Sequence, residues 1–136
     1  PKAGSAFPRR LMTAGGTIGR LKQRQEFLAA ARGRKAGGAS LGLQGLRRPD
    51  GAEPSASAVR LGFTCSKKVG NAVARNRARR RLKAAACEVA PALGLSGCDY
   101  VLIGRTLTID YPFDALKRDL GRAFVEVNGK LAGRGR

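Results

Sequence analysis

The sequence predicts an α+β domain: a two-layer α-β sandwich in which helices pack on one small mixed sheet. Three observations support this fold class. The 136 residues are enough for one domain with its own core. Helix-like and strand-like apolar patterns follow one another in the order α-β-β-α-β-α. The last helix-like segment carries a single apolar stripe, which has to be buried against another layer.

The first elements are an arm and a helix. Residues 1–19 are rich in Gly, Pro, Ala and Ser and include Arg9 and Arg10, so we expect a flexible basic arm. A helical apolar pattern then begins at Leu21 and ends at Gly33. We therefore predict that residues 20–131 form a single α-β sandwich domain, followed by a basic tail over residues 132–136.

Three segments are predicted strands. Residues 39–46 and 58–66 alternate between apolar and polar side chains, and the turn-rich loop 47–57 between them suggests an antiparallel hairpin. Residues 99–106 contain a continuous apolar run. Such a run indicates a strand that is buried on both faces, at the centre of the sheet.

Two longer helices complete the order. After a basic turn at residues 67–71, a helix is expected to continue to about Ala90, because Pro91 and Gly94 follow. The last helix has Pro112 just inside its start. Its apolar residues recur at spacings of 3, 4, 4, 3 and 4, as in an amphipathic helix: Phe113, Leu116, Leu120, Phe124, Val127 and Leu131.

The charge balance indicates a polyanionic partner. Lys and Arg number 27 against 9 Asp and Glu, a formal net charge of +18, which favours nucleic acid first and an anionic membrane second. The chain has no run of 18 apolar residues and no long apolar stretch near its N-terminus, so we expect neither a spanning helix nor a secretory signal. A cytoplasmic protein is the resulting expectation.

Catalytic and metal-binding residues are not expected. The chain has no His, which removes the commonest general base and the commonest metal ligand, and its carboxylates show no paired arrangement. Cys65, Cys87 and Cys98 are separated by 22 and 11 residues, spacings that match no zinc or redox motif. We interpret them as reduced, small apolar residues.

The most informative segment is residues 67–83, in which eight of 17 residues are Lys or Arg and none is acidic. On a helical wheel one arc is apolar, and another carries most of the charge. Guanidinium groups bind phosphate through two hydrogen bonds at once, so this face predicts contact with nucleic acid. The apolar arc is Ala74, Ala78, Leu82, Ala85 and Val89; the charged arc is Arg75, Asn76, Arg79, Arg80 and Lys83, with Arg77 and Arg81 extending it.

Residues 60–83 resemble the signature of the protein subunit of bacterial ribonuclease P. They include Ser66-Lys67-Lys68 and Gly70-Asn71-Ala72-Val73, and Arg75-Asn76-Arg77 matches the centre of the RNR motif. Upstream, Arg20-Leu21-Lys22 and Glu26-Phe27 also match. The resemblance covers roughly residues 18–130. It implies an α-β sandwich with a left-handed β-α-β crossover, against the usual hand.

The resemblance also implies a function. In that family the protein is a subunit of an endoribonuclease that removes the 5′ leader of precursor tRNA. A large RNA is the catalyst and binds most of the Mg²⁺, and the protein alone is expected to bind none. The implied partners are this catalytic RNA and precursor tRNA, with no membrane and no small-molecule ligand. Residues implied to contact the catalytic RNA are Lys67, Lys68, Asn71, Arg75, Asn76, Arg77, Arg79, Arg80, Arg81 and Lys83.

The leader is implied to lie in a cleft between the first helix and the sheet. The matching residues are Phe27, Leu41, Leu43, Arg20 and Lys22. A second aromatic residue, often present one turn after Phe27 in the family, is Ala31 here. Periodicity alone would place Phe27 in the core, so it is expected to be a core residue, a cleft residue or both. Lys67 and Lys68 could be simple turn residues.

Three other functions remain as alternatives. A non-catalytic RNA-binding module, such as a ribosomal protein, fits the composition but would not restore leader cleavage to a catalytic RNA. A self-sufficient nuclease is disfavoured because the chain lacks His and a carboxylate cluster. A DNA-binding architectural protein is disfavoured by the resemblance.

Overall fold

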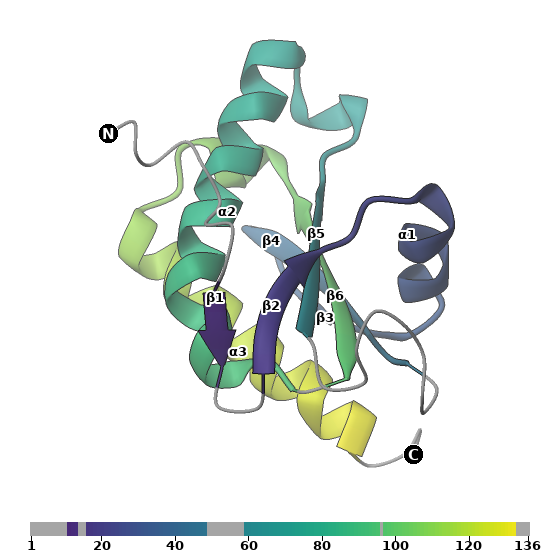
Figure 1. Ribbon diagram of the computed structural model, residues 1–136. Coiled ribbons are helices and arrows are strands. Elements are labelled where there is room, and N and C mark those ends of the chain that lie inside the picture. The colour runs from purple at the N-terminus through teal and green to yellow at the C-terminus, as the bar shows by residue number, and fades with distance from the viewer. Residues whose placement is uncertain (1–10, 14–15, 49–58, 96, 133–136) are drawn as a thin grey trace.

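The computed structural model describes residues 11–13, 16–48, 59–95 and 97–132, which form a six-stranded sheet and three α-helices (Figure 1). The strands lie side by side in the order β1-β2-β5-β6-β4-β3. Their bounds are β1 Leu11–Thr13, β2 Gly16–Arg20, β3 Arg34–Gly37, β4 Leu41–Arg47, β5 Val59–Thr64 and β6 Cys98–Gly104. The helices are α1 Arg24–Ala31, α2 Ala72–Leu93 and α3 Phe113–Ala132, with 3-10 turns η2 Lys67–Val69 and η3 Thr106–Ile109.

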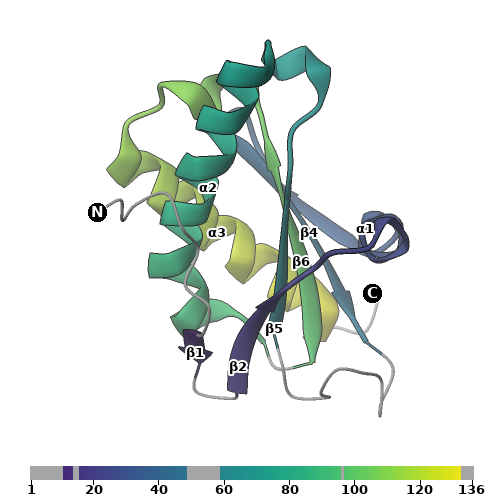
Figure 2. The ribbon, with the colours of Figure 1, turned by 45° about the horizontal axis from the view of Figure 1, so that its top comes forward.

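The helices lie on both faces of the sheet. Helices α2 and α3 cover one face and α1 lies against the other (Figure 2). The main core fills the space between the sheet and α2 and α3, where Tyr100 and Phe124 are fully buried and meet edge to face with their ring centroids 4.8 Å apart. The Tyr100 hydroxyl donates to Asn128 at 2.6 Å, and burial raises the pKa of this phenol. The predicted α+β sandwich is confirmed.

Strand β6 occupies the centre, as its apolar run predicts. It pairs antiparallel with β4 and parallel with β5, and Tyr100, Val101 and Leu102 are buried. Because β5 and β6 are parallel, α2 forms the crossover between them, and the resulting β-α-β unit matches the one that the resemblance implies. Its left-handed sense stays a prediction.

The predicted hairpin between residues 39–46 and 58–66 is wrong. β4 and β5 are not neighbours, because β6 lies between them and takes both as partners. A strand at the centre of a sheet is paired along both edges, and β6 takes β4 on one edge and β5 on the other. The actual hairpin joins β3 to β4 through Gly37, whose φ of +125° suits glycine and whose added Cβ would lie 2.6 Å from the Leu41 carbonyl oxygen.

The predicted domain boundary at residue 20 is also wrong. Residues 11–13 and 16–20 form β1 and β2, and β2 runs parallel to β5 with Ile18 beside Val59. Ile18 is only 3% exposed, so the sheet starts well inside the proposed arm. The sequence pattern missed β2 because Gly16 and Gly19 interrupt it, and it missed β3 because Arg34 and Lys35 give it no apolar face. Residues 1–10 and 133–136, the rest of the predicted arm and tail, lie outside the described residues.

Candidate nucleic-acid interface

The basic segment begins at a well-capped helix start. The Ser66 hydroxyl accepts the Lys68 N–H at 3.2 Å, and the Asn71 side chain accepts the Ala74 N–H at 2.9 Å as the N-cap of α2. Lys67 and Lys68 are exposed directly before this helix, whose first turn contains no acidic residue. The N-terminal end of a helix dipole attracts anions, so the cap and the two lysines together favour a phosphate here.

The apolar base predicted for α2 is confirmed. Ala78, Leu82 and Ala85 are fully buried, and Ala74 and Val89 are partly buried. Because most of these side chains are small, the helix lies close to its sheet and turns the opposite arc outward. Asn76 and Arg80 on that arc are exposed.

The arginines of α2 divide into two groups. Arg77 donates to the Ile109 carbonyl at 3.0 Å, and Arg81 donates to the carbonyls of Thr108, at 2.7 Å, and Tyr111. Both guanidinium groups therefore hold the 3-10 turn η3 against α2. Arg77 and Arg81 were predicted to contact RNA, and both also make a structural contact within the protein. Half of the Arg77 side chain remains exposed, whereas Arg81 is largely enclosed.

The second group, Arg75 and Arg79, forms hydrogen bonds near the start of α2, and Arg80 remains exposed. Arg75 donates to the Gly70 carbonyl at 2.8 Å, and Arg79 bonds the Asn76 side chain. Farther along α2, the Lys83 ammonium lies 5.9 Å from the centroid of the Phe63 ring, and the Arg20 guanidinium lies 5.8 Å from the same centroid. Partial burial lowers the pKa of Lys83, and the positive charges of Arg20 and Arg79 lower it further.

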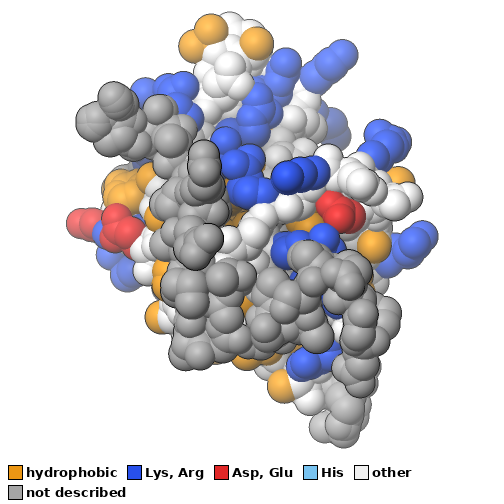
Figure 3. Space-filling view, in the orientation of Figure 1, with side chains coloured by type: hydrophobic (Ala, Val, Ile, Leu, Met, Phe, Trp, Pro, Cys, Tyr) orange, Lys and Arg blue, Asp and Glu red, His pale blue; other side chains and the backbone are white. Residues whose placement is uncertain are grey.

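These contacts extend the basic surface beyond α2. In Figure 3, Lys and Arg side chains gather over α2 and recur beside α1 on the other side of β5. Phe63 lies where these areas meet, since its ring contacts both Arg20 and Lys83. Its place between cations of β2 and α2 depends on the parallel pairing of β2 with β5, which no local sequence pattern predicts.

A cleft of about 470 Å³ opens between α1 and the sheet. Phe27 lies in it half-buried, and Leu28 is 51% exposed at its edge. Phe27 therefore packs on the protein and lines the cleft at once, which was one of the expected outcomes. Of the other predicted leader residues, Arg20 and Lys22 are exposed. The cleft is lined by Arg24, Phe27, Leu28, Ala31, Gln44, Phe63, Thr64, Ser66, Val101 and Ile103.

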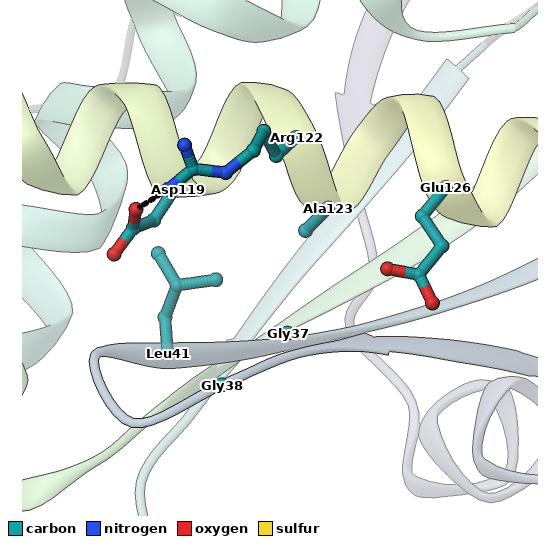
Figure 4. A pocket seen from close by; sticks show the side chains of 7 residues that line it. All are labelled: Gly37, Gly38, Leu41, Asp119, Arg122, Ala123 and Glu126. Carbon is teal, nitrogen blue, oxygen red and sulfur yellow. Dashed lines mark hydrogen bonds and ion pairs between the residues drawn. The ribbon is translucent and has the colours of Figure 1, made fainter.

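The prediction that Leu41 and Leu43 face this cleft is wrong. Each is 1% exposed and belongs to the core beneath α3, on the opposite face of the sheet. Leu41 borders a separate pocket of about 230 Å³ between the β3–β4 turn and α3, where Arg122 pairs with Asp119 at 2.5 Å (Figure 4). Alternation along β4 separates the two faces, but only the tertiary structure shows which face α1 covers. Gln44 is the β4 residue that lines the cleft.

An ion-pair network holds α1 in place. Glu26 accepts hydrogen bonds from the backbone N–H groups of Lys22 and Gln23, at 2.9 and 3.0 Å. Arg60 of β5 binds Glu26 at 2.9 Å and Asp99 of β6 at 2.7 Å. Partial burial acts to raise the pKa of Glu26, but these hydrogen bonds and the Arg60 charge together lower it. Hydrogen bonding to Asp99 raises the pKa of Arg60.

The cysteines lie apart from any cluster of ligands. Burial raises the pKa of Cys65, Cys87 and Cys98, and all three are free thiols. Within the described ranges, no three His, Cys, Asp or Glu side chains are grouped so that they could hold a metal ion. None of the helices found there is both long enough and apolar enough to cross a membrane.

A strongly basic helix face and a half-apolar cleft on one α+β sheet are features typical of a nucleic-acid-binding protein. Residues 18–128 match the family model described as Ribonuclease P. The chain belongs to the ribonuclease P protein family, whose members are subunits of a bacterial endoribonuclease of tRNA processing.

Relatives and solved structures agree with this assignment. The "Ribonuclease P protein component" of Ruegeria pomeroyi is 55% identical over 104 residues, covering 76% of this chain and 81% of its own. That of Paramagnetospirillum magneticum is 47% identical over 111 residues, covering 81% and 83%. The fold matches an RNase P protein of Staphylococcus aureus with a TM-score of 0.62 and 22% identity, covering 79% of this chain and 93% of that one. It also matches the RNase P protein of Thermotoga maritima with a TM-score of 0.60 and 23% identity, covering 74% of this chain and 90% of that one.

Proposed function

We propose that the basic face of α2 binds the catalytic RNA of ribonuclease P while the cleft beside α1 holds the 5′ leader of precursor tRNA. The complex then cuts the leader from the tRNA by Mg²⁺-dependent hydrolysis, in the bacterial cytoplasm. The metal is bound mainly by the RNA, where it supplies an activated water and stabilises the charge that develops on the phosphate.

The observation that carries this proposal is the arrangement of two different surfaces on one small sheet. The α2 face is charged and convex, and it suits the closely spaced phosphates of a folded RNA. The cleft is largely apolar and is lined by two half-buried rings, Phe27 and Phe63. Arg20 and Lys83 share the Phe63 ring between these surfaces, so one chain can contact both RNAs together.

The cleft chemistry favours a single strand over a duplex. Unpaired bases can stack on Phe27 and contact the partly buried Ile103, whereas paired bases are hidden inside a helix. Gln44 and Thr64 at the same cleft offer hydrogen-bonding groups to exposed base edges.

Reconstitution tests the proposal. The chain is mixed with a bacterial catalytic RNA and precursor tRNA at an Mg²⁺ concentration too low for the RNA to act alone, and mature 5′ ends are measured. We expect cleavage with the wild-type chain and weaker assembly with Arg80→Ala, which removes an exposed cation of α2. Arg118→Ala, which removes an exposed cation from α3, is the matched control and should assemble normally.

The same experiment separates the RNA-binding alternative. A simple RNA-binding module would bind the catalytic RNA with the same salt sensitivity but would leave the precursor uncut. Binding without restored cleavage therefore contradicts the proposed function.

A further inference from the structure

We propose that β5 sets the position of Phe27 in the cleft through Gly62 and Arg60, which are positioning residues for the 5′ leader. This inference rests on the proposed function, because it assumes that the leader contacts Phe27. The Arg60 side chain and the position of a Cβ at Gly62 both face α1, because residues two apart on a strand share a face of the sheet. They act on two consecutive residues of α1, Glu26 and Phe27.

Gly62 determines how deeply the Phe27 ring lies. A Cβ atom at position 62 would lie 2.6 Å from Cε1 and 2.8 Å from Cζ of Phe27, and 3.0 Å from Cδ1 of Leu21. These separations are shorter than van der Waals contact, so the ring rests directly on the backbone of β5. An alanine would therefore push the ring outward, into the cleft that it lines.

Arg60 determines how α1 is oriented. Its guanidinium binds Glu26 through one nitrogen, at 2.9 Å, and Asp99 through two others, at 2.9 and 2.7 Å. The Arg60 side chain is 13% exposed and that of Asp99 is 5% exposed, so solvent screens this contact less than a surface pair. Glu26 also caps the start of α1, which makes the ion pair a direct link between the helix terminus and the sheet.

The helix needs such links because it is short. Eight residues are too few for a helix to be stable by itself in water, so its contacts determine where it lies. Its apolar contacts are a small cluster in which Leu21, Ala30 and Val101 are buried and Phe27 and Ile103 are partly buried. A change at residue 60 or 62 should therefore move the cleft wall while the main core under α2 and α3 stays intact.

The experiment measures how much the leader adds to substrate binding by the holoenzyme. Affinities are measured for precursor tRNA with a leader and for mature tRNA, and their ratio is compared among variants. The variants are Gly62→Ala, Phe27→Leu and the double variant. Gly19→Ala is the matched control, because it adds a methyl group to the neighbouring strand where the nearest atom, Cγ of Arg60, is 3.9 Å away.

We expect Gly62→Ala to reduce the leader's contribution about 5-fold or more, the scale of one lost base–aromatic stack. KM should rise for the leader-bearing substrate, with little change in kcat or in binding of mature tRNA. Phe27→Leu should produce a similar loss, and the double variant should lose no more than Phe27→Leu alone. Gly19→Ala should match the wild type.

A second variant covers the case in which Gly62→Ala fails to fold. Glu26→Gln keeps the oxygen that caps α1 and replaces the oxygen that accepts from Arg60 with an NH2 group, so both the charge and the hydrogen bond to Arg60 are lost. It should also reduce the leader's contribution, whereas Glu88→Gln, which breaks an exposed pair with Lys117, should not.

The outcomes distinguish a failure of the proposed leader site from a failure of the positioning role. If the wild-type holoenzyme gains nothing from the leader, or Phe27→Leu keeps the full gain, the proposed leader site is wrong. If Phe27→Leu loses the gain while folded Gly62→Ala and Glu26→Gln keep it, only the positioning role fails. Additive losses in the double variant would likewise overturn action through Phe27.

Discussion

Arg20 of β2 and Lys83 of α2 lie against one aromatic ring, that of Phe63, at 5.8 and 5.9 Å from its centroid. This arrangement brings two cations together, and the repulsion is part of what lowers the pKa of Lys83. The fold therefore holds a charge that is unfavourable in the free protein and that a bound polyanion would stabilise.

Replacing Lys83 with Met should stabilise the free protein and weaken its binding to RNA. Met keeps an apolar stem on Phe63 and removes one like charge, which is worth a few tenths of a kcal/mol, so the melting temperature at pH 7 should rise by about 1–3 °C. Affinity for the catalytic RNA should fall in a parallel binding assay. A lower melting temperature would show that the ammonium contributes favourable contacts to the fold.

The Lys83 effect should also depend on pH. The folded chain lowers the pKa of Lys83 below the usual 10.5, so above the folded pKa the unfolded chain holds this proton more tightly. The cost of the charge is therefore fully present at neutral pH and is relieved as pH rises from the folded pKa to the usual value of 10.5. Thermal melts at increasing pH should show that the difference in melting temperature between Lys83→Met and wild type becomes smaller. A difference in melting temperature that stays constant would exclude a charge effect.

Arg80 and Arg81 should behave differently although they are adjacent. Arg81→Ala removes donors to the carbonyls of Thr108 and Tyr111, so it should lower the free energy of unfolding by about 1.5–3 kcal/mol, as measured by denaturant titration. Arg80 is exposed, so Arg80→Ala should leave stability within about 0.5 kcal/mol and weaken RNA binding. Equal stability losses would mean that the contacts to η3 contribute little.

Salt should weaken binding to the catalytic RNA steeply. If the α2 face and its basic turn neutralise about six phosphates or more, affinity should fall at least ~10³-fold between about 50 and 200 mM salt. Arg80→Ala should reduce the slope of log affinity against log salt by about one, and the α3 variant Arg118→Ala should not. A slope unaffected by Arg80→Ala would place the docking surface elsewhere.

Leu43 and Phe27 offer a direct test of which face of the sheet meets the leader. Leu43→Ala should cost about 2–5 kcal/mol of folding stability because it opens a cavity in the main core. Among folded holoenzyme it should leave the leader's contribution to binding unchanged. Phe27→Leu should do the reverse, with a small stability cost and a lost leader contribution. A selective leader defect in Leu43→Ala would restore the original assignment.

Several features were predictable because they depend on local pattern. The apolar arc of α2 identified its buried residues, such as Ala78 and Leu82, since a helix of fixed pitch presents one stripe to its neighbour. The continuous apolar run of β6 indicated a central strand, because only a strand covered on both faces excludes polar side chains. Asn71 was expected only as an RNA contact, and its role as the N-cap of α2 comes from the structure.

The errors arose where pairing between distant segments decides the result. β2 lies in a glycine-rich stretch and becomes a strand by pairing with β5, some 40 residues later, and β1 pairs in turn with β2. β4 and β5 looked like a hairpin because they are consecutive, yet β6 comes between them. Neither arrangement could be predicted, because the local sequence pattern does not encode which distant strands pair.

The sequence by itself determined the polyanionic partner, the residues of the basic helix and the alternation within each strand, because charge and periodicity are properties of the chain. Only the tertiary structure decided which sheet face α1 covers, which arginines of α2 remain available and where Phe63 lies. These depend on strand order and on contacts such as Arg81 with Thr108 and Arg60 with Glu26. Such contacts join residues about 30 positions apart, and their free energies are realised only when the whole sheet has formed.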